Sequence, residues 1–108
     1  MIDAARIARL KRGACVVNAS RGGVVLESAL LEGLASGQLH YVSLDVFEDE
    51  PLPPGSVWWD HHSAMITPHV AGLAPRYAEQ ALSLLSANLI RYREDRPLLN
   101  RADRAAGY

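Results

Sequence analysis

A short apolar run from Ala14 to Ala19 constrains the fold of this chain more than any other feature of its sequence. The run follows Gly13 and ends where the chain becomes polar. Six residues suit one strand, and a nearly continuous apolar strand is typical of a parallel sheet covered on both faces. Cys15 lies inside this run, so we expect a small buried side chain there rather than a reactive thiol.

Helical and extended patterns alternate along the rest of the chain. In order, the predicted elements are a helix over 3–11, a strand over 14–19, a helix over 27–36, strands over 41–46 and 64–67, and a helix that Pro75 opens. Gly37 is expected to end the second helix. An alternation of this kind is expected of a doubly wound α/β sheet with parallel strands.

Composition excludes several classes of protein. The 11 basic and 12 acidic side chains leave a net charge of -1, which predicts neither nucleic acid nor an anionic membrane as partner. One cysteine excludes a disulfide within the chain. No apolar run reaches membrane-spanning length and no signal segment opens the chain, so a cytoplasmic location is expected.

Polar side chains follow each of the three predicted strands. Arg21 comes after the first strand, Asp45 and Glu50 after the second, and His69 after the third. Ligands of open α/β sheets bind at the carboxyl ends of the strands. These four side chains are therefore expected to share one edge of the sheet.

The grouping suits the reduction of a 2-oxo acid. A guanidinium such as that of Arg21 matches a carboxylate with paired hydrogen bonds and can polarise the adjacent carbonyl. The imidazole of His69 can exchange a proton with the carbonyl oxygen, and Glu50 can orient that imidazole. Taken singly, each residue has a plainer interpretation: a surface turn, a solvated acidic loop over 47–63, or an exposed imidazole. Their placement after successive strands favours the functional interpretation.

Three segments resemble motifs of the D-isomer-specific 2-hydroxyacid dehydrogenases, in the C-terminal part of their NAD-binding domain. They are the arginine motif over 13–25, the Asp-Val-Phe-x-x-Glu-Pro motif over 43–53, and the Thr-Pro-His motif over 66–72. The tail over 97–100 and the closing Gly107-Tyr108 are most similar to the glyoxylate/hydroxypyruvate reductase branch. Many members have Asp where this chain has Leu26, so the second helix lacks a good N-cap, at a cost of about 1 kcal/mol.

The resemblance implies a role for each site residue. Arg21 would bind the substrate carboxylate, His69 would act as acid and base, and Glu50 would assist it. Asp45 would bond the nicotinamide carboxamide. The full set implied to line the NAD or NADP site is Asn18, Ala19, Ser20, Arg21, Asp45, His69, Ala71 and Gly72. The resemblance further implies a small 2-oxo or 2-hydroxy acid as substrate, no metal, and a homodimer or other self-association.

A complete dinucleotide site is expected to lie outside these residues. Such a site needs a Gly-x-Gly-x-x-Gly turn and an acidic residue about 20 positions later, and the chain contains neither. Residues 1–74 are therefore interpreted as the second half of an NAD(P)-binding Rossmann domain, and 75–108 as a helix and tail that return to a substrate domain. The chain is expected to be an enzyme fragment that is inactive alone, with exposed apolar surface.

Two other functions compete with the enzyme fragment. The chain could be an interaction module that pairs with a dehydrogenase subunit or with itself through its open sheet edge and last helix. It could also be a nucleotide sensor without catalysis. A sensor needs none of Arg21, Glu50 and His69, so the presence of all three argues against that function.

Overall fold

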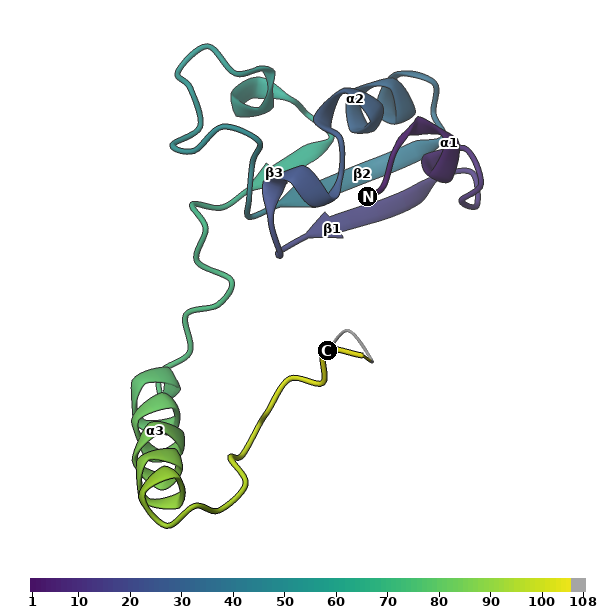
Figure 1. The fold of residues 1–108 in the computed structure, drawn as a ribbon. Coiled ribbons are helices and arrows are strands. Elements are labelled where there is room, and N and C mark those ends of the chain that lie inside the picture. Colours follow the sequence, from purple (N-terminus) through teal and green to yellow (C-terminus); the bar gives the residue numbers. More distant parts are fainter. Residues whose placement is uncertain (106–108) are drawn as a thin grey trace. The chain divides into compact units, whose positions relative to one another are not determined.

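The computed structural model describes residues 1–105, so Gly107 and Tyr108 of the tail lie outside the described residues. The chain divides into two compact units, of which the first comprises residues 1–72 and the second begins at Leu73. Figure 1 traces both units along the chain.

Three parallel strands form the centre of the first unit. They are β1 (Ala14–Asn18), β2 (Leu39–Leu44) and β3 (Ala64–Ile66), in the order β1-β2-β3. Asn18 pairs with Leu44, and Leu44 with Ile66, so the three strands end side by side. The α/β class and the parallel sheet are confirmed, and the residues that follow each strand meet at one edge.

Two α-helices and two short 3-10 turns accompany the sheet. They are α1 (Ala4–Ile7), η1 (Gly22–Val24), α2 (Glu27–Ala35) and η2 (Val57–Asp60). Both α-helices lie on the same side of the sheet in Figure 1. The core that they enclose with the sheet comprises Ile7, Val25, Ala29, Leu30, Leu39, Val42, Leu44, Phe47 and Trp58.

The first helix is shorter than predicted, because a side chain distant in sequence binds its carbonyl groups. The α-helix ends at Ile7 instead of continuing to Lys11. Gln38 donates from Nε2 to the carbonyl oxygens of Ile7, at 3.4 Å, and Leu10, at 2.7 Å. The chain then turns at Gly13, whose φ of 76° lies in the left-handed region that favours glycine.

The expectation that β1 is covered on both faces is wrong. Cys15 is exposed, and Val17 has 72% of its surface exposed. Met65 of β3 is also exposed on this side, since it pairs with Ser43, the partner of Val17. An apolar strand predicts cover on both faces, but α1 and α2 cover only one. Cys15 is therefore not the buried side chain that the apolar run predicted.

The second helix follows its prediction closely. Gly37, with a φ of 69°, follows its C-cap Ser36, and the N-cap position is Leu26, which provides no side-chain bond. The sequence pattern places Leu26, Leu30, Leu31 and Leu34 on one face of this helix, but Leu30 is 1% exposed whereas Leu26 is 39% exposed. The loop between β2 and β3 is not featureless, because η2 interrupts it and places Trp58 in the core at 1% exposure.

The second unit contains α3 (Tyr77–Arg93), which begins two residues after Pro75. The spacing of Ala78, Leu82, Leu85, Leu89 and Tyr92 predicts an apolar stripe on this helix, and the last four of these residues are exposed. The tail folds back onto this helix: Asn88 donates to the carbonyl of Leu99 at 3.2 Å and accepts its N–H at 2.8 Å. Within the described part of the chain, no helix has the length and apolar character needed to cross a membrane.

Substitutions of Leu30 in α2 and of Leu26 at its N-cap position test whether burial or the sequence pattern determines the contribution of a leucine to stability. Leu30→Ala should lower the free energy of unfolding by about 2–5 kcal/mol, because it leaves a cavity in the core. Leu26→Ala should cost less than about 1 kcal/mol, because that side chain is already partly in water. Urea unfolding followed by circular dichroism measures both values. Equal losses would contradict this assignment of the core.

Candidate active site

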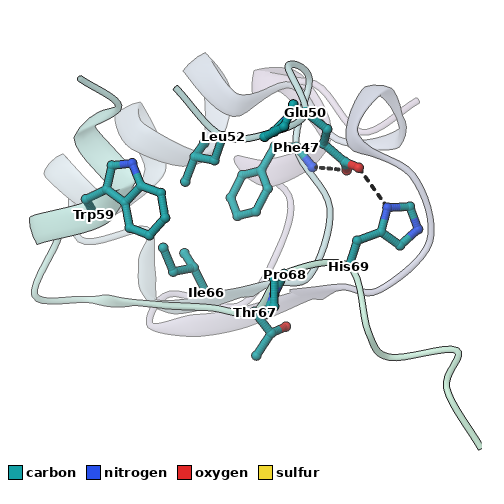
Figure 2. A pocket seen from close by; sticks show the side chains of 9 residues that line it. Phe47, Glu50, Leu52, Trp59, Ile66, Thr67, Pro68 and His69 are labelled. Atoms are coloured by element: carbon teal, nitrogen blue, oxygen red, sulfur yellow. Dashed lines mark hydrogen bonds and ion pairs between the residues drawn. The ribbon is translucent and has the colours of Figure 1, made fainter. Parts of the chain in front are cut away.

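An imidazole and a carboxylate form the centre of the site at the carboxyl edge of the sheet. Nδ1 of His69, which follows β3, lies 2.7 Å from Oε2 of Glu50 in the loop after β2. Figure 2 shows this contact, with the other ring nitrogen of His69 on the side of the ring away from Glu50. Both side chains are partly exposed, at 45% for His69 and 35% for Glu50. The free nitrogen can therefore meet a ligand.

Glu50 is held from both of its oxygens. While Oε2 contacts His69, Oε1 accepts the backbone N–H of Phe47 at 3.0 Å. The His69 bond, followed by the Phe47 bond, holds the pKa of Glu50 below its ordinary value of 4.5, and the positive charge of Arg21 lowers it further. Glu50 is thus a carboxylate at neutral pH, fixed in orientation towards the imidazole.

Arg21 precedes Gly22, whose backbone packs against the carbonyl of Phe47. The N–H of Phe47 binds Glu50, so the structure brings the turn of Arg21 to the loop that carries Glu50. Its side chain is exposed and folds back, with Nη1 donating to the carbonyl of Ser20 at 2.6 Å. That bond uses one of five guanidinium donors. The remaining donors can bind an anion.

Asp45 shapes the turn that carries His69. Its carboxylate accepts the hydroxyl of Thr67, the N–H of Val70 at 2.9 Å and the N–H of Ala71 at 2.8 Å. Between these donors, His69 adopts a φ of 53°, in the left-handed region that is uncommon for a residue other than glycine. The three bonds to one carboxylate hold the turn closed around that conformation.

The same bonds change what Asp45 can offer a cofactor. The Thr67 hydroxyl, ahead of the backbone N–H groups, holds the pKa of Asp45 below its ordinary value of 3.8. Oδ1 accepts two of the three hydrogen bonds and Oδ2 accepts one. One lone pair of Oδ2 remains for a further donor such as a carboxamide N–H. The predicted nicotinamide contact is therefore compatible with this geometry, but Asp45 first of all orders the chain.

Asn18 plays a comparable part after β1. Its Oδ1 accepts the N–H and the hydroxyl of Ser20, at 3.3 and 2.9 Å, and its Nδ2 donates to the carbonyl of Arg21 at 3.1 Å. Asn18 is buried at 5% exposure, whereas Ala19 and Ser20 face solvent. The buried Asn18 side chain thus holds the backbone of the segment that leads to Arg21, while Ala19 and Ser20 in that segment remain exposed to solvent.

The predicted cofactor edge is partly open to solvent. Ala19, Ser20, Ala71 and Gly72 are exposed, and they follow β1 and β3 at the end of the sheet where ligands of such folds bind. The cofactor roles of these four residues, and those of Asn18, Arg21, Asp45 and His69, stay predictions. Among residues 1–105, no group of three or more His, Cys, Asp and Glu is suited to a metal ion.

Sequence reasoning missed three residues that hold the site together. Thr67 bonds Asp45, Phe47 bonds Glu50, and Gly22 packs against the backbone of Phe47. A Cβ at Gly22 would overlap the carbonyl oxygen of Phe47, so only glycine permits this approach. The glycine after Arg21 was visible in the sequence, but nothing there showed which backbone it meets.

An apolar pocket of about 700 Å³ adjoins the His69–Glu50 pair. Phe47, Leu52, Trp59 and Ile66 line it, with Glu50 and His69 at one end (Figure 2). The free ring nitrogen of His69 lies on the other side of the ring from these side chains.

Removing the Thr67 hydroxyl tests the Asp45 contacts. Thr67→Val should raise the pKa of Asp45, because this hydroxyl is the largest cause of its lowering. A carboxyl group whose pKa is lower in the folded state than in the unfolded state stabilises the protein at pH values above its unfolded-state pKa. This stabilisation is lost as the pH falls through the folded-state pKa. The variant should therefore lose stability at a higher pH during acid titration. Carbon-13 NMR of the carboxyl group measures the pKa directly.

Thr67→Ser is the matched control, because it keeps the hydroxyl. Its Asp45 pKa should stay low. If Thr67→Val also left this pKa unchanged, the hydroxyl would not be its cause.

Comparison with known proteins places this chain in a family. Residues 1–71 match the family model described as "D-isomer specific 2-hydroxyacid dehydrogenase, NAD binding domain". The whole chain is 39% identical to a glyoxylate/hydroxypyruvate reductase A of Salmonella newport and covers 34% of that protein.

Two solved structures are similar over 99% of the chain, each at 41% identity. One is a D-isomer-specific 2-hydroxyacid dehydrogenase from Xanthobacter autotrophicus Py2 in complex with NADPH and MES, with a TM-score of 0.87 and 43% of that chain covered. The other is an NADPH-dependent glyoxylate/hydroxypyruvate reductase from Sinorhizobium meliloti in complex with NADP and sulfate, with a TM-score of 0.83 and 35% covered.

The chain spans about a third of the length of the curated relatives that it matches. The expected link to NAD or NADP is confirmed at the level of the family, because the matching model is an NAD-binding domain and both structures hold such a cofactor. The predicted Rossmann-type architecture is confirmed by the same similarity. The chain therefore belongs to the D-isomer-specific 2-hydroxyacid dehydrogenases.

Proposed function

We propose that this chain provides the substrate-binding and proton-transfer edge of an NAD(P)-dependent oxidoreductase that interconverts a 2-oxo acid and a D-2-hydroxy acid. The observation that carries the proposal is the 2.7 Å contact between His69 and Glu50 at the carboxyl edge of the sheet, with the turn of Arg21 packed against the backbone of Phe47. The names of the similar reductases favour glyoxylate or hydroxypyruvate as the oxo acid.

Arg21 binds and orients the substrate in this proposal. Its guanidinium can hold the substrate carboxylate with two parallel hydrogen bonds and neutralise its charge. Since the 2-oxo group is bonded to the carboxylate carbon, the same side chain can polarise the carbonyl towards its oxygen. The carbon that accepts the hydride becomes more electrophilic as a result.

His69 supplies the proton. As the carbonyl carbon receives a hydride, the former π electrons move to oxygen, and the free ring nitrogen of His69 gives its proton to that oxygen. The product is the 2-hydroxy acid with a neutral imidazole. In the reverse direction the imidazole takes the hydroxyl proton. When bound, a reduced nicotinamide cofactor supplies the hydride.

Glu50 keeps His69 ready for this step. Its carboxylate accepts a hydrogen bond from the Nδ1–H of His69, which fixes the ring orientation and favours the protonated imidazole. Glu50 cannot turn away, because its second oxygen is bound to the N–H of Phe47. The pair therefore presents one ring nitrogen to the substrate before the substrate arrives.

The exposed segments on either side of the pair would hold the nicotinamide ring. Ala19 and Ser20 lie on the β1 side, and Ala71 and Gly72 on the β3 side. The chain lacks the glycine-rich turn that binds a pyrophosphate, so the remaining contacts would come from residues outside these 108. We infer that the chain by itself is inactive and that residues 75–108 serve the substrate domain.

A chimera tests the assignment of His69. The chain can replace the matching region of the Salmonella newport reductase, because the two align over all 108 residues. His69→Ala in this chimera should lower kcat by about 100- to 10,000-fold, the usual contribution of a general acid or base. The affinity for NADPH should change little, since hydride donation and proton donation are separate. Steady-state kinetics with glyoxylate and NADPH fluorescence measure the two effects.

His62→Ala is the control. His62 is also an exposed histidine of the same unit, but it stacks on His61, with 5.3 Å between ring centroids, instead of pairing with Glu50. Its kcat should match that of the unmodified chimera. Undiminished turnover in the His69 variant would refute the catalytic assignment.

A second function is favoured by the open face of the sheet. Cys15, Val17 and Met65 are exposed on that face, as an interaction module that pairs with a dehydrogenase subunit or with itself would require. Such a module should form one discrete oligomer that does not bind NADPH. Sedimentation at increasing concentration distinguishes the two functions, because a monomer at high concentration contradicts the module.

A further inference from the structure

We propose that Glu27, at the start of α2, is a positioning residue that fixes the loop of Glu50 and the turn of Arg21 relative to each other. This inference rests on the proposed function of Glu50, His69 and Arg21. Glu27 touches none of the three. It acts through the backbone of the residues between them.

Both carboxylate oxygens of Glu27 are bound by the segment that follows β2. Oε1 accepts the backbone N–H of Glu48 at 2.7 Å, and Oε2 accepts the indole N–H of Trp58 at 2.7 Å. Trp58 is 1% exposed, so its N–H needs a partner inside the protein. A single side chain thus ties the two ends of the loop segment 48–58 to α2.

Glu48 returns the contact. Its Oε1 accepts the backbone N–H of Glu27 at 3.0 Å, so the two residues exchange carboxylate-to-backbone bonds across 21 positions of sequence. The N-cap residue Leu26 offers no side-chain acceptor to α2. Glu48 therefore satisfies one of the first four N–H groups of α2, which have no partner within the helix. The negative charge also suits the N-terminus of a helix.

The peptide groups of Phe47 and Glu48 connect this contact to the site. The N–H of Phe47 binds Glu50, and the N–H of Glu48 binds Glu27. Between them, the carbonyl of Phe47 packs against Gly22, the residue after Arg21. Two adjacent residues thus touch the Glu50 carboxylate, the Arg21 turn and the start of α2. Any shift of Glu48 moves the N–H that orients Glu50.

Glu27→Gln and Glu48→Gln each remove one negative charge and leave the size of the side chain nearly unchanged. Comparing them distinguishes the positioning role of Glu27 from the effect of losing a charge. Glu27→Gln must break a bond, because both oxygens accept hydrogen bonds and an amide nitrogen cannot. Glu48→Gln can keep its contact, because its described bond uses Oε1 alone and the amide oxygen can take that place. The loop should loosen only in the first variant.

The ionisation of Glu50 reports the outcome without any cofactor or substrate. Carbon-13 NMR of its carboxyl group in the 108-residue chain should show a higher pKa in Glu27→Gln, because the bonds from His69 and Phe47 that hold it low are weakened. Glu48→Gln should titrate like the unmodified chain. In the chimera, Glu27→Gln should lower kcat at least about threefold with little change in the KM for NADPH.

Other outcomes overturn the proposal. An unchanged Glu50 pKa in Glu27→Gln, with a displaced indole N–H resonance of Trp58, would show that the bond is broken without consequence for the site. Equal shifts in both variants would assign the effect to lost charge. If Glu27→Gln fails to fold, Glu48→Ala removes one exposed bond and should raise the Glu50 pKa; no change would refute positioning. None of these outcomes depends on whether His69→Ala is inactive.

Discussion

The carboxylate of Asp45 is the feature on which the geometry of the site depends. It lies at the end of β2 and receives three donors from the segment that follows β3, so it joins the ends of two neighbouring strands. His69 lies within that segment at a positive φ, a conformation that needs such support in a residue other than glycine. The direction of the imidazole is therefore set by a buried charge of the neighbouring strand.

The acidic residues around Glu50 are partners of backbone N–H groups rather than a solvated charge run. Glu27, Glu48 and Glu50 each accept one backbone N–H, and these bonds connect α2, the loop and the site. A carboxylate on an N–H forms a charge-assisted hydrogen bond, which is stronger than a neutral one. These three bonds fix the backbone of the loop beside the site and join it to the start of α2.

Sequence patterns predicted the parallel sheet and the gathering of Arg21, Glu50 and His69 because both depend on local signals: strand-length apolar runs and the residues that end them. The patterns failed where the cause lies elsewhere in the chain. Gln38, 31 positions away in sequence, binds the carbonyl group of Ile7 at the end of the first helix. The sequence pattern around Ile7 gives no sign of this contact. Cys15 was predicted to be buried because an apolar strand implies two covered faces, and residues 1–72 cover only one.

The sequence also did not predict that buried polar side chains hold the site in place, and the reason is physical. Asn18 and Asp45 are the buried polar residues among those described, and each accepts from and shapes the segment that bears a reactive side chain. Burying such groups is unfavourable unless all their bonds are made, so each fixes one conformation of its segment. The side chains proposed to act in catalysis, Arg21 and His69, are exposed and can meet a ligand. The buried side chains of Asn18 and Asp45 thus fix the backbone of the site, whereas Arg21 and His69 lie at the surface.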